Sequence, residues 1–572
     1  MIRYGPPSPF PQEAALHACI LAGDHQRLIN LLWQGPRVHD INYSFHDIGP
    51  PLHYAASRGD IESVDLLLRA GANPKIVTPG NSHNLTALGI ATLHGYRDIV
   101  NIIWPFENPT KSERGQQIRQ DLLVLAAREG HLPVVHLVLT LSQDWSERTR
   151  GQAFLEATRR WHLNVVTFLL GWLRIEQSII LEALQYVIGY KPVPSSPGLS
   201  QSGAIQNPNR KSLLELLINN VANVNAHIFK DTPLIYYLAE NTNSVKALEI
   251  LLLKGADPNQ TNVEGRSTLH VLTKSVPVDT SGDWTYAQLD QAIRLLLRHK
   301  ASPSQQDKNG EAPIHWAAYA FTYGLFRLYL FSLPEERRRH VLQMRNHYGE
   351  TLLHFASAAC CTEIMAFLIS QGLDVNAVNS NGWRPLMCTM IPSKKLFPSG
   401  PIGRTNPSMR ERVEAARLLL SHGADPTTTT KEGWTPLHGL ALHRGDDDLG
   451  FDLARELLSR GVDPNCRATL LTPRFDMIEL DLPWGYRLPK MIARPQSWGL
   501  VSRPGLQPIH WAVERSSVGV IRALLAHKIT LSPKDKEICR DMVNGSKSIG
   551  GDQKLMEILH KFLNPDGEED KE

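Results

Sequence analysis

Six histidines stand in similar short strings and are the first candidates for chemistry, because imidazole serves as a base or a metal ligand near neutral pH. They are His53, His270, His315, His354, His438 and His510. A helical zinc site needs a His-Glu-x-x-His string, which the sequence lacks. Each of the six belongs to its own copy of the string, so each is expected on a separate helix. We therefore predict structural histidines, with no catalytic or metal site.

Cysteines and glycines add no further chemistry. None of the six cysteines lies in a Cys-x-x-Cys pair that would indicate zinc. The string Gly545-Ser546-Lys547-Ser548 lacks the Gly-Lys pair of a phosphate-binding loop. No Gly-x-Ser-x-Gly string marks a nucleophilic serine either. The sequence therefore predicts a protein that is not an enzyme and needs no cofactor.

Composition limits the partners and the compartment. Hydrophobic residues make up 42% of the 572 residues, which is enough for a core. The formal charge of +3 argues against a protein that binds nucleic acid through bulk charge. No apolar run approaches the roughly 20 residues that span a bilayer, and none follows the N-terminus as in a signal peptide. We expect a monomer in the cytoplasm or the nucleus, without membrane contact or direct contact with nucleic acid.

A repeat organises the chain around these histidines. One copy runs from Pro51-Leu52-His53-Tyr54-Ala55-Ala56 through a leucine-rich string to Gly71-Ala72-Asn73-Pro74. Similar copies return along the chain, and 33 residues separate His354 from the equivalent Met387. A fixed period of this length is typical of stacked repeats.

Each copy predicts two short helices. Thr435 suits the N-cap of the first helix and Pro436 its first turn, where the missing N–H costs nothing. Gly461 is expected to end the second helix, because glycine takes positive φ without strain. Two such helices cannot bury their apolar sides alone, so the copies are expected to stack on one another.

This pattern resembles the ankyrin repeat, which has a period of about 33 residues and a Thr-Pro-Leu-His-x-Ala string. The resemblance implies an all-α solenoid of about thirteen helix–turn–helix units with several loop inserts, similar to the multi-repeat ankyrin proteins of filamentous fungi. It also implies that the repeated histidines bond to the turn and to the neighbouring unit. The predicted units begin near Ala14, Pro51, Thr86, Asp121, Gln152, Ile180, Thr232, Ser267, Ala312, Thr351, Arg384, Thr435 and Gln507.

The spacing of the copies gives the predicted boundaries. An N-terminal tail covers 1–12, N-terminal and degenerate repeats cover 13–190, and a flexible insert covers 191–210. Repeats continue over 211–530, with inserts near 273–289, 391–408 and 466–505. Capping helices are expected at 531–563 and an acidic disordered tail at 564–572.

The resemblance also indicates where partners bind, because the hairpins between ankyrin units face partners. The candidate partner-binding residues directly follow a turn glycine and are Trp383, Trp434, Arg266, Glu311 and Glu350. Two exposed tryptophans there would be strong anchors, since tryptophan is enriched among residues that dominate binding. The alternative is that each ring packs over the next hairpin.

The resemblance implies a non-enzymatic scaffold or adaptor that binds proteins through the concave face of a solenoid. A transcriptional co-regulator, such as one of a fungal metabolite pathway, is the alternative, and the basic residues Lys394, Lys395 and Arg404 would then be tested as an import signal. An enzyme that uses the concave face is the third alternative.

Overall fold

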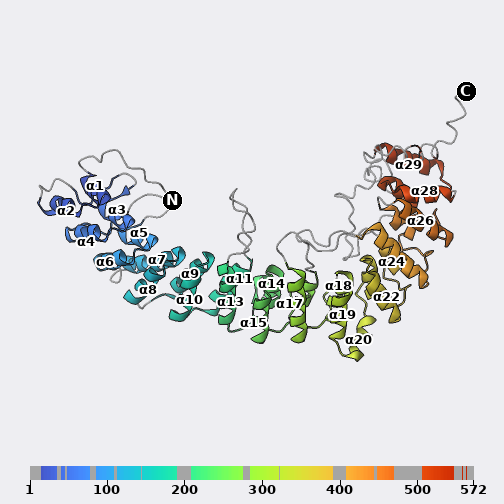
Figure 1. Cartoon of the computed structure of the whole chain (residues 1–572), viewed down its shortest axis with the longest axis horizontal. Coiled ribbons are helices and arrows are strands. Elements are labelled where there is room, and N and C mark those ends of the chain that lie inside the picture. Colours follow the sequence, from blue (N-terminus) through green and yellow to red (C-terminus); the bar gives the residue numbers. More distant parts are fainter. Residues whose placement is uncertain are drawn as a thin grey trace, which may run out of the picture. The chain divides into compact units, whose positions relative to one another are not determined.

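The structure is a computed structural model. It describes residues 14–34, 40–45, 48–77, 85–107, 113–142, 145–189, 208–274, 284–320, 322–390, 407–443, 447–468, 505–527, 529–545, 557, 559 and 562. The chain divides into two compact units, residues 1–224 and 225–572. In the part that the structure describes, helices dominate and the strands form one two-stranded sheet (Figure 1).

Unit 1 is built from short helices in sequence order. They are α1 (Ala15–Ala22), α2 (His25–Ile29), the π-helical turn η2 (Asn30–Gln34), α3 (Pro51–Arg58), α4 (Ile61–Arg69), α5 (Ala87–His94), α6 (Arg97–Glu107), α7 (Glu113–Glu129), α8 (Leu132–Leu141), α9 (Glu147–Arg159), α10 (Leu163–Trp172), α11 (Gln177–Gly189) and α13 (Pro208–Asn220).

Unit 2 opens with the hairpin of β1 (His227–Ile228), the 3-10 turn η4 (Phe229–Asp231) and β2 (Thr232–Pro233). Its helices are α14 (Leu234–Asn241), α15 (Val245–Leu253), α16 (Thr268–Lys274), α17 (Tyr286–Arg298), α18 (Pro313–Ala320), α19 (Tyr323–Phe331), α20 (Glu335–Leu342), α21 (Leu352–Ala358), α22 (Thr362–Ser370), α23 (Pro385–Met390), α24 (Met409–Ser421), α25 (Pro436–Ala441), α26 (Asp447–Ser459), α27 (Pro508–Arg515), α28 (Val518–Ala526) and α29 (Pro533–Gly545).

Within each unit the helices form pairs that stack. In unit 2, first helices pack on first helices, as α16 does on α18 and α18 on α21. Second helices pack on second helices, as α22 does on α24 and α24 on α26. Counted over the described residues, the pairs from α1–α2 to α27–α28 number thirteen, which confirms the predicted all-α solenoid.

Local sequence explains how the helices begin and end. Pro436 is at the first turn of α25 behind its N-cap Thr435, which forms a capping box with His438, and the Thr435 hydroxyl lies 2.8 Å from His438 Nδ1. Gly461 follows α26 with φ of 91°, as expected for a residue that ends a helix in the left-handed region. Lys300 has φ of 65° at the equivalent place after the second helix α17, so this repeat holds the turn without glycine.

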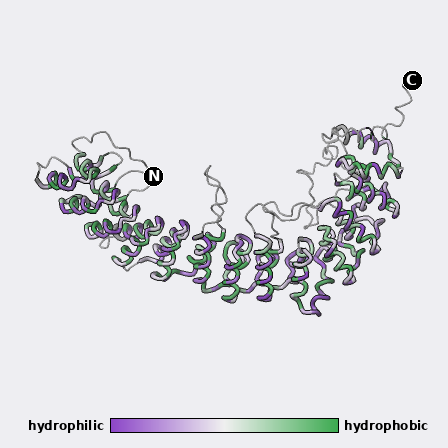
Figure 2. Tube along the Cα trace, in the orientation of Figure 1, coloured by the Kyte–Doolittle hydropathy of each residue, from purple (hydrophilic) through white to green (hydrophobic). Residues whose placement is uncertain are grey.

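The apolar residues of each pair face its neighbours. Figure 2 shows hydrophobic and hydrophilic residues mixed along the helices, as expected when each helix has one buried side. The leucine pairs of the second helices are buried, for example Leu67 with Leu68 and Leu457 with Leu458. This burial is shared between adjacent pairs, so each pair depends on the next for its core.

Several predictions from the spacing fall on residues outside the described part of the chain. These are the tails 1–12 and 564–572, and most of the inserts at 191–210, 391–408 and 466–505, with Lys394, Lys395 and Arg404. Three insert boundaries lie in helices instead, because α13 begins at Pro208, α16 ends at Lys274 and α17 begins at Tyr286. Among the described helices, none is long and apolar enough to cross a membrane.

Candidate protein-binding surface along the hairpins of unit 2

The hairpins before the first helices of unit 2 are bonded to one another through their backbones. The N–H of Lys308 donates to the carbonyl of Glu264 at 3.0 Å, and the N–H of His347 donates to the carbonyl of Asn309 at 2.9 Å. The next two links repeat the geometry, from Ser380 to Tyr348 at 2.7 Å and from Lys431 to Asn381 at 3.0 Å. Five successive hairpins therefore form one continuous edge.

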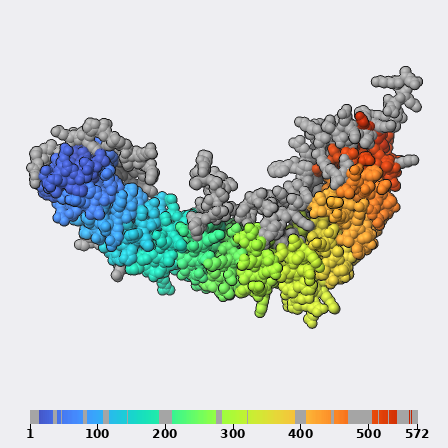
Figure 3. All heavy atoms as spheres, in the orientation of Figure 1, coloured from blue at the N-terminus to red at the C-terminus, as the bar shows by residue number. Residues whose placement is uncertain are grey.

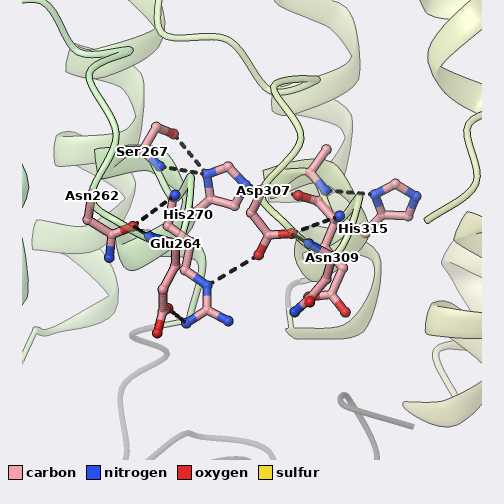
Figure 4. A network of polar contacts seen from close by, with 10 residues as sticks. Asn262, Glu264, Ser267, His270, Asp307, Asn309 and His315 are labelled. Carbon is pink, nitrogen blue, oxygen red and sulfur yellow. Dashed lines mark hydrogen bonds and ion pairs between the residues drawn. The ribbon is translucent and has the colours of Figure 1, made fainter. Parts of the chain in front are cut away.

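A polar side chain closes each turn. Asn262 Oδ1 accepts from the backbone N–H groups of Glu264 and Arg266, both at 3.0 Å. Asp307 Oδ1 accepts in the same way from Asn309 at 2.9 Å and from Glu311 at 3.0 Å (Figure 4). Such bonds satisfy the amides of the turn and hold its tip in place.

Three of the repeated histidines, His270, His354 and His438, join a first helix to the following hairpin. His270 Nδ1 accepts from the N–H of Ser267 at 3.0 Å, so the ring proton is on Nε2, which donates to the carbonyl of Glu311 at 3.1 Å (Figure 4). His354 bonds in the same way to Thr351 and to the carbonyl of Trp383. Burial lowers the pKa of His354 to about 4. These rings are neutral and fully engaged, as the resemblance implies for a structural role.

The predicted exposure of Trp383 and Trp434 is wrong. Trp383 is 3% exposed and Trp434 is 0% exposed. The Trp434 ring centroid lies 5.3 Å from that of Trp511 and 5.4 Å from that of His438. The residue after the turn glycine turns inward, so both rings are buried, and that of Trp434 packs against the following unit, as the alternative prediction held.

The same position is buried in two other hairpins. Glu311 and Glu350 are each 1% exposed, so neither carboxylate is displayed to a partner. Glu350 accepts from Asn346 Nδ2 at 2.7 Å in its own hairpin and from Asn379 Nδ2 at 3.2 Å in the next. The predicted binding carboxylate is therefore an internal link between two hairpins.

Arg266 is the one predicted residue of this set whose side chain is partly exposed, at 25%. Its Nε donates to Asp307 Oδ2 of the next hairpin at 3.2 Å, and its guanidinium also pairs with Glu264 (Figure 4). Because the Asp307 side chain is 1% exposed, the pair also neutralises a buried carboxylate.

The exposed positions lie three residues earlier in each hairpin. We call Val263, Lys308, His347, Ser380 and Lys431 the tip residues, and all five are exposed. Each directly follows the residue that closes the turn and is part of the bonded edge. The sequence reasoning missed this position because its side chains share no type. The tip position could have been located from the sequence by its place between the turn-closing residue and the turn glycine.

A stack of helix pairs joined by bonded hairpins defines an α-helical solenoid repeat protein. Family models agree with this class. "Ankyrin repeats (3 copies)" matches residues 16–111, "Ankyrin repeats (many copies)" matches 353–388 and 408–446, and "Ankyrin repeat" matches 229–263 and 432–469. The chain is an ankyrin-repeat protein, as predicted.

Similar proteins share parts of the chain. The Nuclear factor NF-kappa-B p105 subunit of Gallus gallus is 27% identical over 275 residues, which cover 47% of this chain and 20% of that protein. The B-cell lymphoma 3 protein homolog of Mus musculus is 27% identical over 175 residues, covering 31% of this chain and 34% of that protein. The crystal structure of the Bcl-3 ankyrin repeat domain has 21% identity and a TM-score of 0.28, covering 41% of this chain and 88% of that chain. The matched parts of the chain thus span 20% and 34% of the length of these two curated relatives.

Proposed function

We propose that the protein is a non-enzymatic scaffold or adaptor that binds partner proteins along the hairpin edge of unit 2. The observation that carries this proposal is the row of exposed tip residues on five hairpins whose backbones are bonded in series. A surface held in this way loses little conformational freedom on binding, so its contacts contribute more fully to affinity. Solenoids present extended surfaces of this kind to other proteins.

The chemistry of the edge suits a protein segment. Val263 is 57% exposed and offers an apolar contact, while Lys308, His347 and Lys431 offer polar and charged contacts on three of the next four hairpins. The interior of the edge gives no support to catalysis at His270 and His354, because each ring bonds through one nitrogen to the start of its own helix and through the other to the following hairpin. The proposed role is therefore recognition by a preformed surface.

The test compares partner recovery for charge-reversed variants of two surfaces. Lys308→Glu/Lys431→Glu changes the hairpin edge, and Arg410→Glu on α24 is the matched control because that side chain is 80% exposed on a second helix. Proximity labelling in the native cell, quantified by mass spectrometry, should show a set of proteins reduced about tenfold in the edge variant. The same set should be retained in the control. Equal recovery for all three proteins would refute binding along this edge.

A transcriptional co-regulator is the second candidate. Supporting it, part of the chain is similar to a protein named as a nuclear factor. Imaging of the tagged protein should then show nuclear accumulation, lost when Lys394, Lys395 and Arg404 are replaced by alanine. A protein that stays outside the nucleus under all growth conditions would contradict this candidate and leave the scaffold proposal standing.

A further inference from the structure

A second surface with defined chemistry lies on the second helices of unit 2. The additional helix α20 follows α19 before the next hairpin and projects from the stack on the side of the second helices (Figures 1 and 3). Four side chains of these two helices form what we call the arginine–aromatic cluster, Tyr323, Arg327, Phe331 and Arg338. Arg327 Cζ lies 5.6 Å from the Tyr323 ring centroid and 5.1 Å from that of Phe331, and Arg338 Cζ lies 4.7 Å from that of Phe331.

The cluster holds its arginines in position. Arg338 Nε donates to the carbonyl of Leu333 at 2.8 Å, which orients the guanidinium. Stacking on an aromatic face restrains the plane of a guanidinium but leaves its outer N–H groups available in that plane. Phe331 is 46% exposed, so an apolar surface lies beside the two cations.

The charge around the cluster is mostly positive. Arg337 and Arg339 are exposed on α20, while Glu335 and Glu336 lie in its first turn, where the helix dipole favours acids. Within the described part of the chain, neither Arg327 nor Arg338 forms an ion pair with a carboxylate. Two pre-oriented guanidinium groups are thus available to an acidic group from another molecule.

A similar cluster elsewhere in unit 2 shows what such arginines pair with. On α26 the Phe451 ring has Arg455 Cζ at 5.7 Å and Arg522 Cζ at 5.0 Å. Here the chain supplies the acids itself, since Arg455 pairs with Asp452 at 3.8 Å and Arg522 with Asp448 at 3.6 Å. The α19–α20 cluster has the same stacking without these aspartates.

We propose that the arginine–aromatic cluster binds an acidic, partly apolar segment of a partner protein. Two carboxylates of the segment pair with Arg327 and Arg338, and a neighbouring apolar side chain covers Phe331. Planar guanidinium groups match carboxylates through paired N–H···O bonds, which gives geometric as well as electrostatic selection. The site is separate from the tip residues. Binding at this site would be a second interaction, in addition to the one proposed for the hairpin edge.

A nucleic acid fits this site less well. Glu335 and Glu336 lie on the same short helix as the arginines and would repel a continuous phosphate backbone. The formal charge of the whole chain is only +3, so no wider basic field attracts a polyanion. An aromatic site for bases also needs open ring faces for stacking, whereas arginines stack on Phe331 here.

The experiment uses the full chain and a fluorescein-labelled peptide of alternating glutamate and leucine, followed by fluorescence anisotropy. Arg327→Gln/Arg338→Gln should weaken binding about tenfold or more, since two charge-assisted contacts are lost. Arg327→Lys/Arg338→Lys keeps the charge but not the planar stack, and should also weaken binding severalfold. Arg410→Gln on α24 is the control and should bind as the unchanged protein does.

Three results would overturn the proposal. The unchanged protein could fail to bind the peptide, or the glutamine variant, with unchanged circular dichroism, could bind as tightly as the unchanged protein. A single-stranded RNA of matched length could instead bind more tightly than the peptide and lose its binding in the glutamine variant, which would assign the site to nucleic acid. Because the tip residues are intact in every variant, none of these results bears on the hairpin edge.

Discussion

The ring of His438 bonds to the carbonyl of Leu506, a residue 68 positions further along the chain, at 3.0 Å. His438 Nδ1 accepts from the N–H of Thr435 at 3.1 Å, so Nε2 carries the proton and donates to Leu506. The same contact in other repeats crosses 41 positions, from His270 to Glu311, or 29, from His354 to Trp383. The repeat geometry is thus preserved where the sequence between two units is longest.

Replacing residues 469–504 by a short glycine–serine turn should leave the fold intact. Ala468 and Leu506 already exchange two backbone hydrogen bonds, of 2.9 and 2.8 Å, so the two ends of the segment lie side by side. A shorter connection has a smaller entropic cost of loop closure, so the junction should be more stable by about 1–2 kcal/mol. Circular dichroism should show the same helix content and an equal or higher thermal midpoint. A lower midpoint would mean that the segment stabilises unit 2.

Stability should fall as the pH is lowered from about 6.5 towards 4. Burial lowers the pKa of His438 from 6.5 to about 4, and the pKa values of His315 and His354 likewise fall to about 4. The unfolded chain therefore binds more protons than the folded chain in this window, and the stabilisation is complete only above it. Each such histidine should lower the free energy of unfolding by about 1.4 kcal/mol per pH unit. Urea-unfolding midpoints at pH 7, 6 and 5 measure this slope.

The variant His438→Gln separates this titration from general acid sensitivity. The variant should be less stable at pH 7, because glutamine does not reproduce the bonds of the ring. Glutamine cannot take up a proton, so the slope of the free energy of unfolding against pH should be smaller by the contribution of about one proton. Parallel curves for the variant and the unchanged protein would show that His438 does not titrate in this window.

Two glycines with equal φ should respond differently to alanine. Gly433 and Gly423 both have φ of +87°, a conformation that costs alanine about 1–2 kcal/mol. A Cβ on Gly433 would meet the Arg467 carbonyl oxygen at 2.2 Å, whereas one on Gly423 would meet nothing within 4 Å. Gly433→Ala should therefore lower the thermal midpoint clearly more than Gly423→Ala. Equal losses would show that backbone strain alone decides both.

The sequence predicted what depends on neighbours along the chain. Capping and φ preferences within one unit explain why α25 starts at Pro436 and why Gly461 follows the second helix of that pair, α26. The period of the repeat is likewise visible in the sequence. The burial of Trp434 could not be read in this way, because it depends on the packing of Trp511 from the next unit. Glu350 is a similar case, since one of its two partners, Asn379, belongs to the following hairpin. The exposure of a side chain in a solenoid depends on its contacts with the neighbouring unit, and the spacing of residues within one repeat carries little information about those contacts.

The two neighbours Lys431 and Trp434 should separate binding from stability. Trp434 is 0% exposed, so Trp434→Ala should cost about 3–5 kcal/mol through the cavity it leaves and should lower the thermal midpoint of unit 2. Lys431 is exposed at the tip of the same hairpin, so Lys431→Ala should leave the midpoint within a degree or two and reduce partner recovery. Thermal unfolding followed by circular dichroism and quantitative proximity labelling measure the two effects. If Trp434→Ala instead kept its stability but lost its partners, the tryptophan would be a binding residue despite its burial. The tip residues would then no longer suffice to explain recognition.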